Sequence, residues 1–271
     1  MTCQWQCAFA IVLASLTGCS TQSMLPTDEP AVREQIARQG LSESDNLTRV
    51  SALAKKIESA YTSCSTLKFT AKITEPPHPE LKRVEIAMTP GRLKSRIFID
   101  DVPVLVWTHA DGQWQECKAA YRGIPAQYFF MPVQSPDEPI DVRLSDGIER
   151  HMCGFGGYYH TWLAKDSGRI RYFTMRVSNG FWIGTHRVDN HRCDVVACLP
   201  NQNYGGTELI YIRPDGFISR WDSIRRSRPD ESPRLVRIRT YSDFQLHPLP
   251  PETWEFESIP KEAMEVVRVQ E

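Results

Sequence analysis

The sequence predicts a mainly β protein of the α+β class, in which one large antiparallel sheet is accompanied by a few helices. From residue 66 onward, apolar and polar residues alternate with a period of two in one segment after another. This alternation is typical of strands that bury one face. Turn signals such as Asp111-Gly112 and Asn179-Gly180 separate the segments, which favours hairpin connections. No internal repeat or low-complexity segment divides the chain, so we expect a single sheet.

The first residues predict a secretory signal. An uncharged apolar run, Cys7–Leu16, leads into Leu16-Thr17-Gly18-Cys19, which resembles the bacterial lipobox. We therefore expect a lipoprotein signal peptide over residues 1–18 and a mature chain that begins at a lipidated Cys19. As a helix, the apolar run would rise only about 15 Å, half of a hydrocarbon core, so a membrane span is disfavoured. Simple secretion is the remaining alternative, because residues 1–6 carry no Lys or Arg.

Charge and length set further bounds. The chain carries 32 Lys and Arg residues against 33 Asp and Glu residues, so it is close to neutral. Proteins that bind nucleic acid normally carry a basic excess, and we expect no nucleic-acid partner. A mature chain of about 250 residues is long enough for one substantial core. We expect a lipidated tether with a possible short helix over residues 19–46, followed by one folded domain over residues 47–271.

Two helices are predicted ahead of the sheet. A short helix over residues 29–39 would have Pro30 in its first turn and Gly40 after its end. The longer helix, over residues 47–61, places its apolar residues at helical spacing and therefore has one face to bury. Asp45 or Asn46 is its expected N-cap.

Some ten strands are predicted after the helices. Between residues 121 and 168, prolines interrupt the alternation, and only a short helix over residues 144–152 is expected there. The segments that read as strands are 66–74, 81–89, 93–99, 102–108, 113–118, 169–177, 181–187, 192–199, 207–213, 217–225 and 234–244.

Several short motifs, taken in their order along the chain, resemble one known family. The matching pieces are residues 61–74, 88–93, 111–114, 188–193, 212–218 and 240–260. On these motifs the chain resembles the periplasmic lipoprotein-carrier superfamily, which comprises the carriers and receptors of lipoprotein sorting and their lipoprotein relatives. The resemblance covers about residues 47–265 and implies a curved half-barrel sheet whose concave side is covered by helices. It also implies an apolar groove that takes acyl chains or hydrophobic peptide.

The chain also departs from this family. In the sorting carrier, a basic residue before the turn proline is tied to opening and closing of the cavity, whereas Thr89 occupies the matching position here. Residues 144–163 do not resemble the carrier's lid helices. Because this chain is also expected to be anchored, the departures favour a receptor-like or resident role over that of a soluble shuttle.

The resemblance raises one set of strand residues from expected core to candidate groove lining. Ordinary core packing is the alternative for each of them, since large apolar and aromatic side chains dominate the interior of any sheet protein. The candidates are Phe69, Ile73, Val84, Ile86, Met88, Trp107, Trp114, Trp182 and Trp221.

The cysteines and histidines predict neither a disulfide framework nor a metal site. The thiols beyond Cys19 are Cys64, Cys117, Cys153, Cys193 and Cys198, an odd set for which we expect mostly buried free thiols. Cys193 and Cys198 are five positions apart, so a regular strand points them to opposite faces. The pairs His151/Cys153 and His191/Cys193 offer suitable donors without a structural-zinc spacing. No metal or cofactor is therefore expected.

No catalytic signature is present, neither Gly-x-Ser-x-Gly nor His-Glu-x-x-His, and the chain is expected not to be an enzyme. Gly154–Gly157 is predicted to be a flexible turn rather than a phosphate loop. The basic run Arg220–Arg228 fits either contact with anionic lipid headgroups or a solvated hairpin edge.

The leading hypothesis is a membrane-anchored envelope lipoprotein that binds lipid or acylated protein in a hydrophobic groove, without catalysis. The alternative is a structural or sensory envelope lipoprotein that contacts a partner protein and has no open cavity. In both cases the chain would be held by its N-terminal acyl chains and face the periplasm. Ser20 gives no reason to expect inner-membrane retention, so the outer membrane is favoured.

Overall fold

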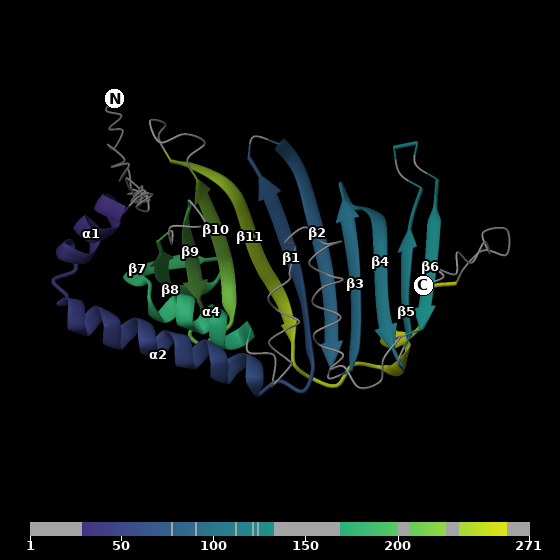
Figure 1. Cartoon of the computed structure of the whole chain (residues 1–271), viewed down its shortest axis with the longest axis horizontal. Helices are drawn as coiled ribbons and strands as arrows, with labels where there is room; N and C mark the ends of the chain where they lie inside the picture. The colour runs from purple at the N-terminus through teal and green to yellow at the C-terminus, as the bar shows by residue number, and fades with distance from the viewer. Residues whose placement is uncertain are drawn as a thin grey trace, which may run out of the picture.

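The protein is built on one curved, open sheet of 11 strands (Figure 1). The computed structural model describes residues 29–258 except positions 77, 90, 112, 121 and 124 and the segments 133–168, 200–205 and 226–232. All neighbouring strands are antiparallel, in the order β6-β5-β4-β3-β2-β1-β11-β10-β9-β8-β7. The sheet does not close, which confirms the predicted half-barrel class.

The sheet consists of two meanders that meet at a single strand pair. In the first, each strand pairs with the next one along the chain; its members are β1 (Leu67–Glu75), β2 (His78–Thr89), β3 (Arg92–Ile99), β4 (Val102–Ala110), β5 (Gln113–Lys118) and β6 (Gln127–Pro132). The second contains β7 (Phe181–Val188), β8 (His191–Cys198), β9 (Gly206–Ile212), β10 (Ile218–Arg225) and β11 (Arg234–Gln245). The β1–β11 pair joins the two meanders, so the first and last strands of the chain form the centre of the sheet.

Most predicted strands are confirmed within a few residues, because their alternation is clear. The exception among the described residues of the irregular middle is β6, which the sequence did not predict. This short edge strand ends at Pro132, and prolines at 125 and 132 masked its alternation. The predicted helix over residues 144–152 lies outside the described residues, as do Gly154–Gly157.

The helices before the sheet form as predicted, with one correction at a cap. Helix α1 (Glu29–Arg38) ends before Gly40, which adopts a φ of +66°. Helix α2 spans Glu43–Thr62, and its N-cap is Ser42, whose Oγ accepts a hydrogen bond from the Asp45 backbone N–H at 3.1 Å. The prediction of Asp45 or Asn46 as the cap was wrong, because the helix begins earlier than its apolar stripe. Asn46 is instead buried in a tertiary contact.

The segment predicted as a strand over residues 169–177 is helix α4 (Arg169–Ser178), so that prediction was wrong. Ten residues of mixed apolar and basic character fit either period, and a short segment does not choose between them. Within this helix, Thr174 and Val177 are buried while Met175 is exposed, which is helical spacing. Contact with α2 decides the outcome, since α4 packs against that helix.

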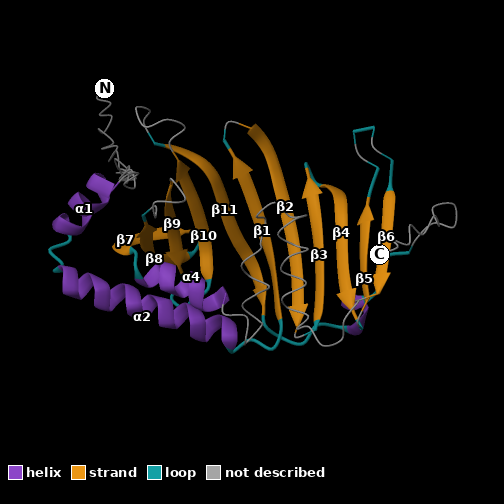
Figure 2. Cartoon of the chain, viewed as in Figure 1, coloured by secondary structure: helices purple, strands orange, loops and turns teal. Residues whose placement is uncertain are grey.

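The α-helices gather at one end of the sheet (Figure 2). Helix α2 contributes Val50, Leu53, Ile57 and Tyr61 to the main hydrophobic cluster, and α4 adds Val177. We call the sheet face that shares this cluster the inner face. In the figure, α2 and α4 lie at the β7–β10 end, while β2–β6 extend away from them.

Two smaller clusters cover the opposite, outer face. Val32 of α1 packs with outer-face residues of β7–β10, such as Ile183 and Val195. Beyond β11, a C-terminal segment containing a short 3-10 helix, Pro251–Trp254, packs Trp254 against Ala87 and Ala110 on the outer face of the first meander. We call residues 246–258 the C-terminal strap. Both meanders therefore bury apolar residues on both faces of the sheet.

Candidate ligand-binding face

The inner face carries the residues that the sequence nominated for a groove. Eight of the nine candidates belong to the main hydrophobic cluster, and each is 7% exposed or less: Phe69, Ile73, Val84, Ile86, Met88, Trp107, Trp182 and Trp221. The side chain of Trp114 is not described; the register pairs the residue with His109 on β4. These eight residues thus share one continuous apolar surface and are buried, and their role as a groove lining remains a prediction.

Cross-strand register explains how distant residues come together on this face. At one level of the sheet, Trp221 of β10 lies opposite Ile210 of β9, which in turn lies opposite Val196 of β8 and then Trp182 of β7. Directly opposed residues of antiparallel strands point to the same side. A single apolar row therefore crosses β7–β10.

The three tryptophans of the cluster are fixed by carboxylates from neighbouring strands. The Nε1–H of Trp107 donates to Glu116 Oε2 at 2.7 Å, that of Trp182 donates to Asp194 Oδ1 at 2.8 Å, and that of Trp221 donates to Glu208 Oε2 at 3.0 Å. A buried indole N–H needs an acceptor, and an ionised acceptor gives a strong hydrogen bond. These tryptophans are consequently held in place by the fold, as core residues are.

Each of these carboxylates also pairs with a cation. Lys118 Nζ lies 2.8 Å from Glu116, Arg176 Nη2 lies 3.2 Å from Glu208, and Arg49 Nη2 lies 3.1 Å from Asp194. None of the three acids was singled out from the sequence. A signal was present, since each is a carboxylate at the inward-facing phase of its strand, where an unpaired charge would be costly.

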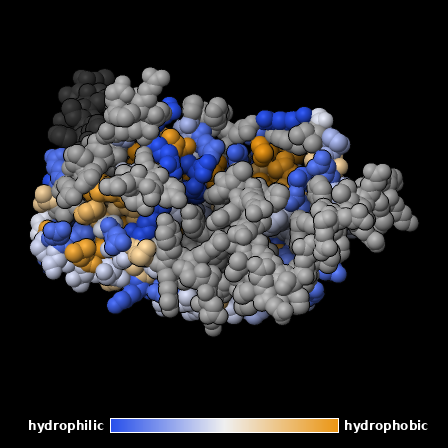
Figure 3. All heavy atoms as spheres, in the orientation of Figure 1, coloured by the Kyte–Doolittle hydropathy of each residue, from blue (hydrophilic) through white to orange (hydrophobic). Residues whose placement is uncertain are grey.

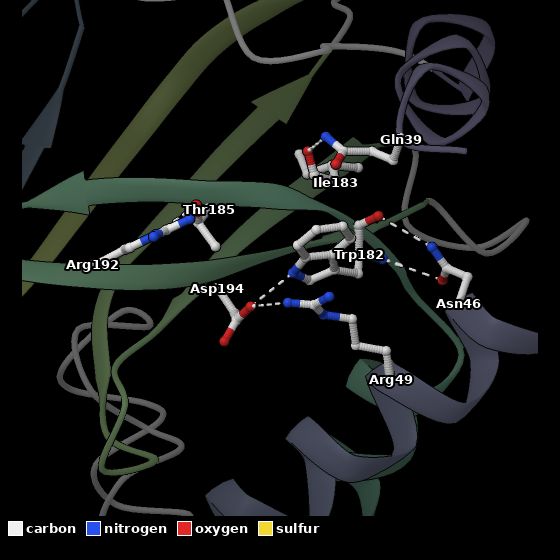
Figure 4. Close-up of polar contacts among 8 residues, drawn as sticks. All are labelled: Gln39, Asn46, Arg49, Trp182, Ile183, Thr185, Arg192 and Asp194. Carbon is white, nitrogen blue, oxygen red and sulfur yellow. Dashed lines mark hydrogen bonds and ion pairs between the residues drawn. The ribbon is translucent and has the colours of Figure 1, made fainter. Parts of the chain in front are cut away.

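Helix α2 is attached to the edge strand β7 through a polar contact (Figure 4). Asn46 Nδ2 donates to the Trp182 carbonyl oxygen at 3.1 Å, and the Trp182 backbone N–H donates to Asn46 Oδ1 at 3.3 Å. One turn later, the Arg49 guanidinium lies 3.5 Å from the centroid of the Trp182 ring while it pairs with Asp194. Asn46 and Arg49 therefore fix the helix over the second meander.

The exposed edge of β7 is covered as well. Gln35 of α1 and Gln39 just after its end both direct Nε2 at the Ile183 carbonyl oxygen, at 3.4 and 3.5 Å, and Figure 4 shows Gln39 in this contact. On the neighbouring strand, Arg192 Nε donates to Thr185 Oγ1 at 3.1 Å. An open sheet edge is a site for unwanted pairing, and α1 blocks it here.

The thiols are free and unreactive in character. Among the described residues, Cys64, Cys117, Cys193 and Cys198 form no disulfide. Cys198 belongs to the inner-face cluster and Cys193 to the outer-face cluster, so their predicted placement on opposite faces is confirmed. Burial raises the pKa of Cys198 to about 12 and that of Cys117 to about 11, which keeps both as neutral thiols. Cys153 and His151 lie outside the described residues.

Neither a metal-binding group of side chains nor a membrane-spanning helix is found among the described residues. Within the described ranges, no group of three or more His, Cys, Asp or Glu side chains is placed to hold a metal ion. In that same part of the chain, no helix is both long and apolar enough to cross a membrane. Cys19 and the signal segment precede the described residues, so lipidation remains a prediction.

Some solved structures are similar to the chain at low sequence identity. No protein-family model matches the chain, and no curated protein matches it. The solved structures similar to it include the MucA/MucB complex of Pseudomonas aeruginosa, with a TM-score of 0.41, 11% identity, and coverage of 77% of this chain and 61% of that chain. The chain thus spans about three fifths of the MucB chain that it matches.

Two mycobacterial proteins are similar to the same degree. LprF from Mycobacterium bovis gives a TM-score of 0.43 at 10% identity, covering 75% of this chain and 95% of LprF. Lipoprotein LppX from Mycobacterium tuberculosis gives 0.42 at 10% identity, covering 75% of this chain and 98% of LppX. At such identities the similarity concerns the fold alone.

Proposed function

We propose that the chain is an envelope lipoprotein that binds a hydrophobic ligand, a lipid or an acylated protein, against its inner face without catalysis. The observation that supports this proposal is the continuous apolar surface of β1–β4, which includes Phe69, Ile86, Met88 and Leu93. Apolar burial supplies the binding free energy, at about 25 cal/mol for each Å² removed from water.

The burial of this surface sets a condition on binding. Its residues are withdrawn from water in the protein alone, so a ligand has to displace whatever covers them. Helices α2 and α4 lie toward the β7–β10 end of the sheet, where Asn46 and Tyr61 tie α2 to strand backbone. In the described part of the chain, no helix is tied in this way to β2–β5, which favours the first meander as the ligand side.

The second candidate function is docking of a partner protein with no ligand cavity. The exposed fractions of the candidate residues, 7% or less, favour it, because an apolar surface already satisfied within the chain has no need of a ligand. One similar structure, MucB, was solved in complex with MucA. The same membrane anchor serves either function.

Binding of an acyl fluorophore separates the two candidates. Protein purified from its native envelope should release a copurified lipid in native mass spectrometry, and the delipidated protein should bind the fluorophore with saturation. Absence of both signals, in protein whose unfolding transition is intact, contradicts ligand binding and leaves the partner function.

Anchoring is tested separately. We propose that Cys19→Ala releases the protein from the membrane fraction to the soluble fraction, because two or more acyl chains are needed for stable attachment. Cys64→Ala is the matched control, since it also removes a single thiol and leaves the lipobox intact. Continued membrane association of the Cys19 variant contradicts the anchor.

A further inference from the structure

One cation on the inner face lies among apolar neighbours. Arg239 of β11 is opposite Ile73 of β1 on one side and opposite Trp221 of β10 on the other. Ile73 is 2% exposed and Trp221 is 3% exposed. The Arg239 side chain therefore lies on the inner face, at the centre of the sheet where the two meanders meet.

The chain satisfies this guanidinium only in part. Arg239 Nη1 donates to Ser223 Oγ at 3.3 Å, and its Cζ lies 5.2 Å from the centroid of the Trp221 ring. Its Nε is withdrawn from solvent and has no hydrogen-bond partner. No carboxylate of the described residues lies within ion-pair distance of Arg239. A buried, unpaired donor on a cation is costly, so this position favours an acceptor that comes from outside.

The neighbouring cation on the same face behaves differently. Arg237 places Nε 2.6 Å and Nη2 2.5 Å from Glu75 Oε1, and Lys82 Nζ lies 3.7 Å from Glu75 Oε2. Glu75 is thus shared by two cations, while Arg239 is left without a carboxylate. Figure 3 shows hydrophilic residues gathered where β11 and β1 reach the upper edge of the sheet. We call Lys82, Arg237 and Arg239 the basic cluster.

We propose that Arg239 binds the anionic head group of an amphiphile, with Lys82 and Arg237 adding positive charge around it. This inference rests on the proposed function and names its ligand class: an acyl chain that carries a carboxylate or a phosphate. From Ile73, the apolar residues of β1 run through Phe69 to Leu67, about 20 Å at 3.3 Å per residue. The acyl chain lies along this run, and its charged end meets the guanidinium.

The test compares amphiphiles that share a chain and differ in head group. Palmitate, hexadecanol and dipalmitoyl phosphatidylglycerol compete with an acyl fluorophore on the delipidated protein, and inorganic phosphate serves as the head without a chain. We expect palmitate or phosphatidylglycerol to bind at least about tenfold more tightly than hexadecanol, which corresponds to about 1.4 kcal/mol. Whichever of the two binds more tightly identifies the source of the charge.

Variants then assign the preference to Arg239. Arg239→Gln should remove the preference for the charged amphiphile and leave the hexadecanol affinity within about twofold, because only the charge-assisted contact is lost. Lys72→Gln is the matched control: Lys72 is an exposed residue of β1 opposite Thr240, on the outer face. It removes the same charge at the same level of the sheet, and we expect both affinities to be unchanged.

The outcomes distinguish this inference from the proposed function. Equal binding of palmitate, phosphatidylglycerol and hexadecanol by the wild-type protein overturns the role of Arg239 and leaves hydrophobic binding intact. Binding of none of them contradicts the proposed function itself. An equal loss of charged and neutral ligands in Arg239→Gln assigns Arg239 to structure alone. If that variant does not fold, the wild-type ratio of charged to neutral affinity decides.

Discussion

The two meanders of the sheet present the same kind of inner face but complete it by different means. In the second meander, two side chains fix α2 to the strands. Asn46 bonds the Trp182 backbone, and the Tyr61 hydroxyl accepts a hydrogen bond from the Ile218 N–H at 3.2 Å. In the first meander, long-range contacts also support the outer face, where Glu257 of the strap and Gln115 exchange two hydrogen bonds at 2.7 and 2.8 Å. The comparison indicates that α2 and α4 cover the inner face of the second meander, whereas the strap supports the first meander on its outer face.

The largest effect is expected from a cavity under α2. Ile57 is fully buried in the main cluster. Ile57→Ala should lower the free energy of unfolding by about 2–5 kcal/mol, because the helix and strands close only partly around the lost volume. Urea denaturation measures it. The acyl-fluorophore affinity should not change if the second meander is purely structural, and a matching loss of affinity contradicts that division.

Met88→Ala is the counterpart in the first meander. Met88 is 2% exposed in the same cluster, so stability should again fall by about 2–5 kcal/mol. Here, however, we expect the fluorophore affinity to change as well, since Met88 lies on the proposed ligand side. Titration of both variants with one probe, under conditions in which both are folded, tests the contrast directly. Identical probe affinities in the two variants remove the distinction between the meanders.

A smaller effect is expected at the polar attachment of α2. Asn46→Ala leaves the N–H and the carbonyl of Trp182 without their partner, and each orphaned group costs about 1–3 kcal/mol. Urea denaturation should therefore show a total loss of at least about 2 kcal/mol. Thr48→Ala is the control, because its hydroxyl bonds only the exposed Ser44 carbonyl within the helix. Equal losses in the two variants would show that the attachment adds nothing beyond helix propensity.

The two meanders should respond alike to loss of a tryptophan acceptor. Asp194→Leu in the second meander and Glu116→Leu in the first each remove the carboxylate that an indole N–H bonds. We expect a loss of about 1–3 kcal/mol in each case, together with a shift in tryptophan fluorescence. If one variant is neutral and the other is not, the tryptophans do not play equivalent roles.

The smallest effect is expected from Glu257 of the C-terminal strap, whose contribution to stability depends on pH. Burial raises the pKa of Glu257, but hydrogen bonds and charge from Lys94 and Arg96 outweigh it, so the pKa is lowered from 4.5. A carboxyl with a lowered pKa in the folded state stabilises the protein above its unfolded pKa, and this contribution is lost as the pH falls from about 4.5 through the folded value. Glu257→Gln should reduce stability at neutral pH by at most about 1 kcal/mol.

The pH dependence of stability provides the control for this effect. Stability curves of the wild type and Glu257→Gln should converge below the folded pKa of Glu257, where both side chains are uncharged. The protection of the strap backbone against hydrogen exchange, relative to the intrinsic rate at each pH, should fall in the wild type over the same range. A constant gap between the two curves at every pH contradicts an ionic role for Glu257.

The sequence by itself determined most of the sheet. Alternation with a period of two depends only on which side of a strand meets water, so segments such as Leu67–Glu75 and Gln113–Lys118 could be placed from residue type. The order of the motifs indicated the half-barrel class, and the resemblance grouped Phe69, Ile86 and Trp221 as one candidate surface before any contact was known. The lipidation of Cys19 remains a prediction.

Only the tertiary structure decided the rest. The helix over residues 169–178 fits two periods, and contact with α2 selects one of them. The central β1–β11 pair joins strands at opposite ends of the domain, and local pattern carries no information on such a partner. Arg239 looks like an ordinary charged residue of an alternating strand. Its inward position, between Ile73 and Trp221 and without a carboxylate, follows from cross-strand register, which exists only once the sheet has formed.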